Sequence, residues 1–305
     1  MNARVPLLVP EMSGYSRKTF KRGTLWDTIV TTGARALQVG AQLPIPTEYE
    51  FIEECGVRFV VRVLSRLGKK DAERRKPGDG FPSGSPVNPF LSYDRDLYVA
   101  GVSDTHVALL NKFNVVEHHL LIVTRRFEDQ DEPLTLEDFE ALWTCMAGID
   151  GLGFYNGGEA AGASQPHKHL QLVPLPFADD LHGVPIEPLL AGAGEQPGPV
   201  AGLPFRHAVA RIDSLAGERV GDAVPVLLDL YEKMMEALDA SGRPYNLLVT
   251  HGWMLFVPRA REHFESVSVN ALGFAGSLFV RNERELQLVK RKGPMHVLRD
   301  VGDGR

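Results

Sequence analysis

A glycine-rich loop that runs directly into a strand is the feature that most constrains how this chain folds. Residues 153–177 read GFYNGGEAAGASQPHKHLQLVPLPF. Side chains alternate between the two faces of a strand. His167, His169 and Gln171 therefore share one face, and Lys168 lies on the opposite face. The sequence predicts a sheet that presents three nitrogen-bearing side chains beside a loop whose backbone N–H groups can approach an anion.

The spacing of apolar residues predicts helices and short strands around this segment. Helices are expected at residues 24–39, 133–149 and 223–240. The second is expected to begin at Thr135, because Asp138 follows three residues later, as in a capping box. Its apolar stripe comprises Leu136, Phe139, Trp143 and Met146. Strands are expected from Phe59 onward and at residues 96–102, 106–110, 118–124, 245–250 and 253–259.

Two blocks of the chain follow a similar pattern. VALLN (107–111) resembles YNLLVT (245–250), and HLLIVTRR (119–126) resembles WMLFVPR (253–259). The pattern suits a duplicated α+β half-barrel in which only the first copy keeps reactive residues. We therefore expect one unit over residues 1–305, with a catalytic half at 20–180 and a degenerate repeat at 201–290.

Composition excludes several classes of function. Thirty-three Lys and Arg residues face 39 Asp and Glu residues, a net charge of -6, which does not suit a general nucleic-acid coat. Residues 62–76 hold a local charge of +5, for which a solvated surface is the simplest interpretation, and the following Pro- and Gly-rich stretch is expected to be a loop. Cys55 and Cys145 form no CxxC pair and so announce neither a zinc site nor a disulfide framework. The N-terminal 26 residues fit neither a signal peptide nor a membrane span, so we expect a cytoplasmic protein with no membrane partner.

Four explanations compete for the histidines. Zinc would need a third ligand close by, and Gln171 is a poor one, so no zinc is expected. The histidines could also be structural, or act as a general acid or base. A nucleophilic histidine is favoured because Ser164, Gln165 and the glycines before it supply donors for phosphate oxygens. A neutral imidazole with a pKa of about 6.5 attacks phosphorus without a strong base and forms a labile phosphoramidate.

The motif His167-x-His169-x-Gln171, preceded by GASQP (162–166), resembles the histidine-triad superfamily, in the branch of nucleotidyl transferases whose third position is Gln. Residues 88–90, 105–130, 245–259 and 268–280 are similar in order to the diadenosine tetraphosphate phosphorylases, also called ATP adenylyltransferases. Glu117 departs from this pattern, because the family commonly has Pro or Gly there. The resemblance implies an α+β histidine-triad-like fold, a duplicated half-barrel of antiparallel sheet with flanking helices.

The resemblance also implies roles for single residues. His169 would be the nucleophile that is adenylylated on the α-phosphorus. His167 would orient the site or bind the leaving polyphosphate, and Gln171 would hydrogen-bond a non-bridging oxygen. The implied substrate-binding residues are Asn111 at the ribose, Lys112, Ser164, Gln165 and Lys70 (or Lys69) at phosphates, Asn156 at the glycine-rich loop, and Asn270 and Arg281 from the C-terminal motif. A strand residue and a solvated charge are equally open interpretations of Asn270 and Arg281.

The implied reaction has two half-steps. His169 attacks the α-phosphorus of diadenosine tetraphosphate and ATP leaves, and orthophosphate then releases ADP from the adenylyl-histidine. Gln171 does not titrate, so it cannot help to deprotonate water, which favours phosphate as the acceptor. The expected partners are these nucleotides and phosphate, with Mg²⁺ or another divalent cation only as a counter-ion. The alternatives are a hexose-1-phosphate uridylyltransferase, which normally carries metal-binding cysteine pairs, a dinucleoside polyphosphate hydrolase, and a nucleotide-binding protein without turnover.

Overall fold

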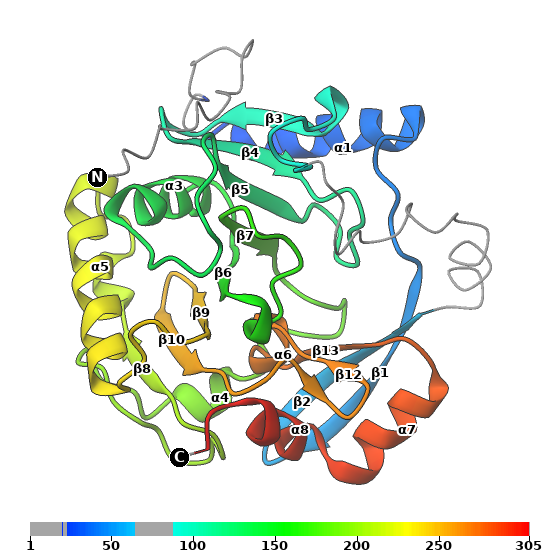
Figure 1. The fold of residues 1–305 in the computed structure, drawn as a ribbon, viewed down its shortest axis with the longest axis vertical. Helices are drawn as coiled ribbons and strands as arrows, with labels where there is room; N and C mark the ends of the chain where they lie inside the picture. Colours follow the sequence, from blue (N-terminus) through cyan, green and yellow to red (C-terminus); the bar gives the residue numbers. More distant parts are fainter. Residues whose placement is uncertain (1–19, 21–22, 65–87, 305) are drawn as a thin grey trace, which may run out of the picture.

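A computed structural model describes residues 20, 23–64 and 88–304 of the chain (Figure 1). Lys69 and Lys70, and most of the basic stretch and of the loop that follows it, lie outside the described residues. Within the described residues, no helix is long and apolar enough to cross a membrane.

An eight-stranded antiparallel sheet forms the centre of the molecule, in the order β3-β4-β5-β7-β6-β9-β10-β8. Its strands are β3 (Tyr98–Gly101), β4 (His106–Leu110), β5 (Leu120–Thr124), β6 (Gly151–Gly157), β7 (His169–Pro174), β8 (Ala208–Arg211), β9 (Tyr245–Val249) and β10 (Trp253–Pro258). A second sheet has the order β1-β2-β13, from β1 (Thr47–Glu54), β2 (Val57–Leu64) and β13 (Ser277–Val280). A small hairpin joins β11 (His263–Phe264) and β12 (Val267–Ser268). The expected α+β fold with a large antiparallel sheet is confirmed.

Helices pack on both faces of the large sheet. One face is covered by α1 (Leu25–Val39), α3 (Leu136–Met146) and α5 (Val220–Ala237), which share an apolar core with Leu170 and Leu172 of β7. The opposite face over β8, β9 and β10 is covered by the second sheet and by α4 (Glu187–Leu190), α6 (Ala271–Phe274), α7 (Glu283–Lys292) and α8 (Pro294–Val301). Over β4 and β5 that same face carries a separate small apolar cluster that includes Phe90. The alternation along β7 therefore points His169 and Gln171 away from the helices α3 and α5.

Helix α3 begins as its sequence predicts. Thr135 caps it, with its hydroxyl accepting from Asp138 N–H at 3.3 Å and its own N–H donating to the Asp138 carboxylate at 2.8 Å. Phe139 and Met146 are buried, but Leu136 is 43% exposed, so the predicted apolar stripe is wrong at its first member. Leu136 is the first residue of the helix, where it projects beyond the core.

The internal repeat involves different strands from those predicted. Each of the helices α3 and α5 is followed by two strands, β6–β7 and β9–β10, and these pairs lie symmetrically in the sheet about the β6–β9 contact. Tyr155-Asn156 and Tyr245-Asn246 occupy corresponding places, with Asn156 opposite Asn246 in the register. The predicted match of 107–111 with 245–250 and of 119–126 with 253–259 is therefore wrong, because β9 and β10 correspond to β6 and β7. The unit boundaries 20–180 and 201–290 stay predictions.

Candidate active site

The three residues of the motif lie together, as predicted, where β7 begins. His167 and Lys168 precede the strand, and His167 makes an isolated bridge with Asp129. Gln171 is opposite Leu121 and His169 is opposite Val123 on β5, so these pairs share one face of the sheet. The Lys168 side chain points the other way and is fully buried, with Nζ 3.0 Å from Glu128, 3.1 Å from the Pro133 carbonyl and 3.4 Å from Asp138.

His169 is held in one tautomer. Its Nδ1 lies 2.8 Å from the carbonyl oxygen of His167, and a carbonyl only accepts, so Nδ1 carries the proton and donates it. Nε2 consequently keeps its lone pair, and it makes no hydrogen bond within the described part of the chain. The side chain is 4% exposed, and this burial lowers the pKa of His169 to about 4, because desolvation disfavours the charged imidazolium. His169 is therefore a neutral imidazole with a free ring nitrogen at physiological pH.

His167 is satisfied at both ring nitrogens. Nε2 lies 2.8 Å from the Thr124 carbonyl and 3.1 Å from the Arg126 carbonyl, so it is the protonated nitrogen and donates to them. Nδ1 accepts from the amide nitrogen of Asn88 at 2.9 Å. Burial lowers the pKa of His167, although the backbone carbonyls oppose the shift. The ring thus fixes the start of β7 to the end of β5, while its carbonyl orients His169.

A relay of side chains fixes the amide of Gln171. The N–H of Phe113 donates to Asn111 Oδ1 at 3.0 Å, so the Asn111 amide nitrogen is the group that faces His119 Nδ1, at 3.2 Å. His119 Nδ1 therefore accepts, and His119 Nε2 donates to Gln171 Oε1 at 2.9 Å. Burial lowers the pKa of His119 to about 4, which keeps it neutral. With its oxygen occupied, Gln171 presents on the face of His169 an NH₂ group that makes no hydrogen bond to any described residue.

His119 is a site residue that the sequence interpretation missed. It lies immediately before β5, at an even spacing from Leu121 and Val123, and therefore on the same face as Gln171. That alternation was the available signal. What the sequence lacked was the register between β5 and β7, which brings His119 and Gln171 together across 52 residues.

An aromatic side chain completes the wall beside the histidines. The ring of Phe90 lies 5.0 Å from the ring of His169 and 5.7 Å from that of His167, measured between centroids. Phe90 packs with Val107, Leu109, Leu121 and Val123 on the same face of the sheet. These apolar neighbours contribute to the burial that lowers the pKa of His167 and His169.

The glycine-rich loop has the open backbone that its sequence predicts. Gly158 and Gly162 have φ angles of 93° and 89°, in the region that favours glycine, and they flank a short 3-10 helix. A Cβ atom at Gly162 would come within 2.8 Å of the Cβ of Asn270, so the loop packs directly on Asn270. Ser164 is exposed and Gln165 is half-buried, and neither side chain makes a hydrogen bond within the described residues. Both are available to a ligand.

Asn156 supports this loop through its side-chain oxygen. It is 1% exposed, and its Oδ1 accepts from the Asn246 amide at 2.9 Å and from the Ala271 N–H at 3.0 Å. Asn246 also donates to the Ala161 carbonyl inside the loop, at 2.9 Å. The expected link of Asn156 to the loop geometry agrees with these contacts, and direct substrate binding by Asn156 stays a prediction.

A buried arginine, which the sequence interpretation did not assign to the site, also holds the loop. Arg259 is 2% exposed and donates to the Asn246 Oδ1 at 2.6 Å and to the carbonyls of Ala161, Val269 and Val301 at 3.2, 2.8 and 3.1 Å. Burial lowers the pKa of Arg259 to about 9, which still leaves it charged at neutral pH. Its donors join the glycine-rich loop to β9, to the segment before α6 and to the C-terminal end of α8.

Of the remaining predicted residues, Lys112 and Asn270 lie beside other predicted site residues, whereas Arg281 does not. Lys112 is exposed beside Asn111, with Nζ 5.5 Å from the Phe113 ring centroid. Asn270 caps α6, its Oδ1 accepting from Leu272 N–H at 3.0 Å, and it lies against the loop. Arg281 follows β13 and pairs with Glu285 at 2.6 Å. Arg281 also donates to the Ser266 carbonyl at 2.8 Å, and among the described residues none of its contacts joins it to the histidines.

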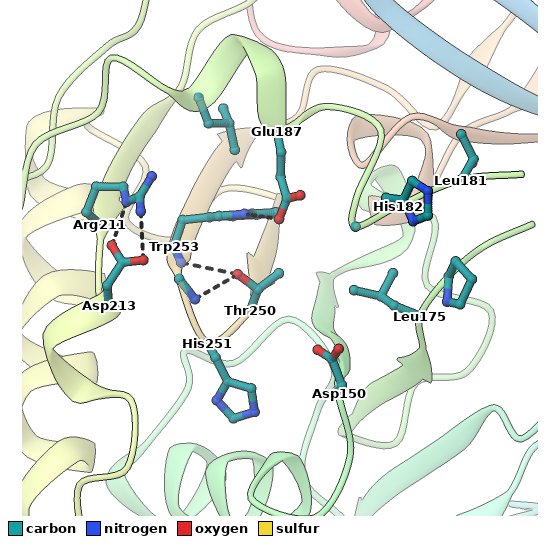
Figure 2. A pocket seen from close by; sticks show the side chains of 14 residues that line it. Asp150, Leu175, Leu181, His182, Glu187, Arg211, Asp213, Thr250, His251 and Trp253 are labelled. Carbon is teal, nitrogen blue, oxygen red and sulfur yellow. Dashed lines mark hydrogen bonds and ion pairs between the residues drawn. The ribbon is translucent and has the colours of Figure 1, made fainter.

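No set of three or more His, Cys, Asp or Glu side chains in the described ranges is arranged to hold a metal ion. A separate pocket of about 540 Å³ lies at the start of β6, the end of β7 and the β9–β10 turn (Figure 2). Arg211 pairs there with Asp213 at 2.6 and 2.7 Å, and the Trp253 indole donates to Glu187 at 2.9 Å. This pocket lies at the opposite end of β6 and β7 from the glycine-rich loop and contains none of the predicted site residues.

Sequence models of Ap4A phosphorylase and ATP adenylyltransferase domains match the N-terminal and C-terminal parts of the chain. The sequence model of the Ap4A phosphorylase N-terminal domain matches residues 15–192, and that of the ATP adenylyltransferase C-terminal domain matches residues 201–303. Diadenosine 5',5'''-P1,P4-tetraphosphate phosphorylase 2 of Saccharomyces cerevisiae is 30% identical over 66% of this chain and 70% of its own length. Protein APA1 of the same yeast is 26% identical over 77% of this chain and 79% of its own. Crystal structures of yeast Ap4A phosphorylase Apa2 in complex with Ap4A and with AMP share the fold, each with a TM-score of 0.76, 22% identity and 93% of this chain covered, and with 98% and 97% of their own chains covered.

Proposed function

Because the chain belongs to the Ap4A phosphorylase family, we propose that it catalyses the phosphorolysis of diadenosine tetraphosphate to ATP and ADP. The state of His169 is the observation that carries this proposal. Its proton lies on Nδ1, bound to the His167 carbonyl, so Nε2 has the free lone pair that a nucleophile needs. The family match disfavours the uridylyltransferase alternative.

In the first half-step, His169 Nε2 forms a bond to the α-phosphorus of diadenosine tetraphosphate. The bond between that phosphorus and the bridging oxygen to the β-phosphorus breaks, and ATP leaves with the oxygen. In the second half-step, an orthophosphate oxygen attacks the same phosphorus and the P–N bond breaks. ADP is released and the neutral imidazole is restored. Both steps are in-line displacements, which need positioning and charge neutralisation more than acid or base chemistry.

The surrounding residues supply that positioning. The free NH₂ of Gln171 would donate to a non-bridging oxygen of the α-phosphate, and its orientation is supported by the donation from His119. The exposed Ser164, the half-buried Gln165 and the N–H groups of the glycine-rich loop would bind the polyphosphate. Asn111 and Lys112 lie at the end of β4, where they would meet the ribose and a phosphate. Lys70 remains a phosphate-binding prediction.

A divalent cation such as Mg²⁺ would act as a counter-ion of the polyphosphate and not as a bound cofactor. Because Gln171 has no titratable group, it cannot help to deprotonate water, which supports phosphate as the second nucleophile. We also propose a cytoplasmic location, to which the unpaired Cys55 and Cys145 are suited.

Product analysis tests this function. Diadenosine tetraphosphate should give equal amounts of ATP and ADP with phosphate present, and labelled phosphate should enter ADP. Without phosphate, one equivalent of ATP should be released per enzyme and the reaction should stop. Continued production of AMP and ATP in water would instead identify a hydrolase, and the absence of any product would identify a binding protein.

A further inference from the structure

His169 stands at the point where two neighbouring strands stop pairing. Strands β6 and β7 pair in register from Gly151↔Pro174 to Phe154↔Gln171. If this register continued for two more residues, Asn156 would lie opposite His169, but the ladder ends before that pair. Buried backbone groups need hydrogen-bond partners, so the N–H and C=O of His169 must find them outside β6.

The side-chain amide of Gln130 fills this gap. Its Oε1 accepts from the His169 N–H at 2.8 Å, and its Nε2 donates to the carbonyls of His169 at 3.2 Å and Asn156 at 2.9 Å. The side chain is 3% exposed. A carboxamide offers the same donor and acceptor as a peptide group, so Gln130 replaces the ladder bonds that β6 and β7 lack.

The direction of the His169 backbone follows from its neighbour. The N–H of Thr124 on β5 donates to the Lys168 carbonyl at 3.2 Å, so that carbonyl faces β5. Backbone groups of successive residues point to opposite sides of a strand. Those of His169 therefore face away from β5, toward Gln130.

Gln130 is itself held on both sides. Its N–H donates to the Pro166 carbonyl at 2.8 Å, and the Tyr155 hydroxyl donates to its carbonyl at 2.5 Å. Two residues earlier, Glu128 accepts from the Lys168 N–H at 2.8 Å and from Lys168 Nζ at 3.0 Å. Residues 128–130 thus run alongside 166–168 and carry the amide into the gap between the strands.

We infer that Gln130 is a positioning residue for the nucleophile, an inference that rests on the proposed function. The Gln130 amide binds both backbone groups of His169 and so fixes the backbone position from which the imidazole extends. The hydrogen bond to the His167 carbonyl then fixes the rotation of the ring. Together they set the direction of Nε2. A displacement of a reacting atom by about 1 Å can cost about 100-fold in rate while leaving binding nearly intact.

Replacement by an isostere without hydrogen bonds provides the test. In Gln130→Met, formation of the adenylyl-enzyme from diadenosine tetraphosphate in a single turnover should slow by about 30- to 100-fold. The Kd for AMP, measured by calorimetry, should change by less than about threefold, because AMP binding does not require the attack geometry. The matched control is Tyr231→Phe, which removes a buried hydroxyl that accepts from Leu134 N–H at 3.2 Å, in the same connection between β5 and α3 as Gln130. This control should keep its adenylylation rate within about threefold of the wild type while losing stability.

A rate in Gln130→Met within threefold of the wild type would overturn the inference, as would a parallel loss of rate and AMP affinity. If that variant does not fold, Gln130→Glu decides. A buried carboxylate would repel the carbonyls of His169 and Asn156, whereas a protonated carboxyl donates to one of them, so the rate relative to wild type should rise from pH 8 to pH 6. A constant ratio would also overturn the inference. If the wild type itself forms no adenylyl-enzyme, the proposed function fails, whatever the effect of Gln130.

Discussion

The low pKa of His169 predicts a nucleophile that keeps working in acid. At pH 5.5 a histidine with a pKa of about 4 is about 97% neutral, whereas one with an ordinary pKa of about 6.5 is about 9% neutral. The buried ring therefore retains about tenfold more of the reactive form than a solvated histidine would. The rate of adenylyl-enzyme formation should stay nearly constant between pH 8 and pH 5.5.

The assay is a rapid quench of the enzyme with labelled diadenosine tetraphosphate, without phosphate. This substrate is preferable to ATP because its phosphates are all internal and do not titrate in this range, so the profile reports the enzyme. Circular dichroism at each pH should establish that the protein is still folded. A rate that falls tenfold between pH 7.5 and pH 5.5 in the folded protein would refute the assignment of a desolvated, neutral His169.

The same burial makes the fold sensitive to acid. The pKa of His169 is lower in the folded than in the unfolded chain, so the unfolded chain binds more protons between pH 6.5 and pH 4 and stability falls as the pH drops through that window. The pKa of His119 is lowered in the same way. At pH 5, each of the two histidines lowers the free energy of unfolding by about 2 kcal/mol relative to neutral pH. Urea unfolding at pH 7 and pH 5 should show that His169→Asn loses about 2 kcal/mol less than the wild type. An equal loss in both proteins would contradict the shift.

Three further outcomes follow from the site. His169→Asn should abolish the labelled enzyme and lower turnover by several orders of magnitude, and labelling that persists in this variant would move the nucleophile to another residue. His119→Phe should leave the Gln171 amide free to rotate and lower kcat/KM by about 10- to 100-fold, the range expected for one buried hydrogen bond, and unchanged kinetics would remove the relay from the mechanism. Chelation of divalent cations by EDTA should raise the KM for diadenosine tetraphosphate, because the tetraphosphate then enters with its full charge, and an unaffected KM would show that protein donors suffice.

The local features of the fold were predictable because they depend on neighbours in the chain. Thr135 and Asp138 cap a helix within a single turn, and alternation alone places His169 and Gln171 on the same face of β7. The repeat was harder, since VALLN and YNLLVT look alike only as apolar strands. Its correct alignment, Tyr155-Asn156 with Tyr245-Asn246, depends on which strands meet at the centre of the sheet.

The site residues that were missed all act over long separations in sequence. His119 reaches Gln171 across 52 residues, Gln130 reaches His169 across 39, and Arg259 reaches Ala161 across 98. Gln130 lies in a loop, where no periodicity indicates which way a side chain points. Such contacts depend on strand register, which a single sequence does not specify.

These supporting residues explain why an acidic chain can handle a tetraphosphate. Arg259 is charged but buried, and it uses its donors on backbone carbonyls that shape the glycine-rich loop, not on the ligand. Two neutral side chains act in the same way. Gln130 binds the backbone of His169, and His119 donates to the side-chain amide of Gln171. N–H donors stabilise charge more effectively where their reorganisation is prevented and the local dielectric constant is low. Near His169, fixed dipoles therefore supplement the exposed Lys112 and the divalent counter-ion in neutralising the tetraphosphate, so a net charge of -6 does not prevent its binding.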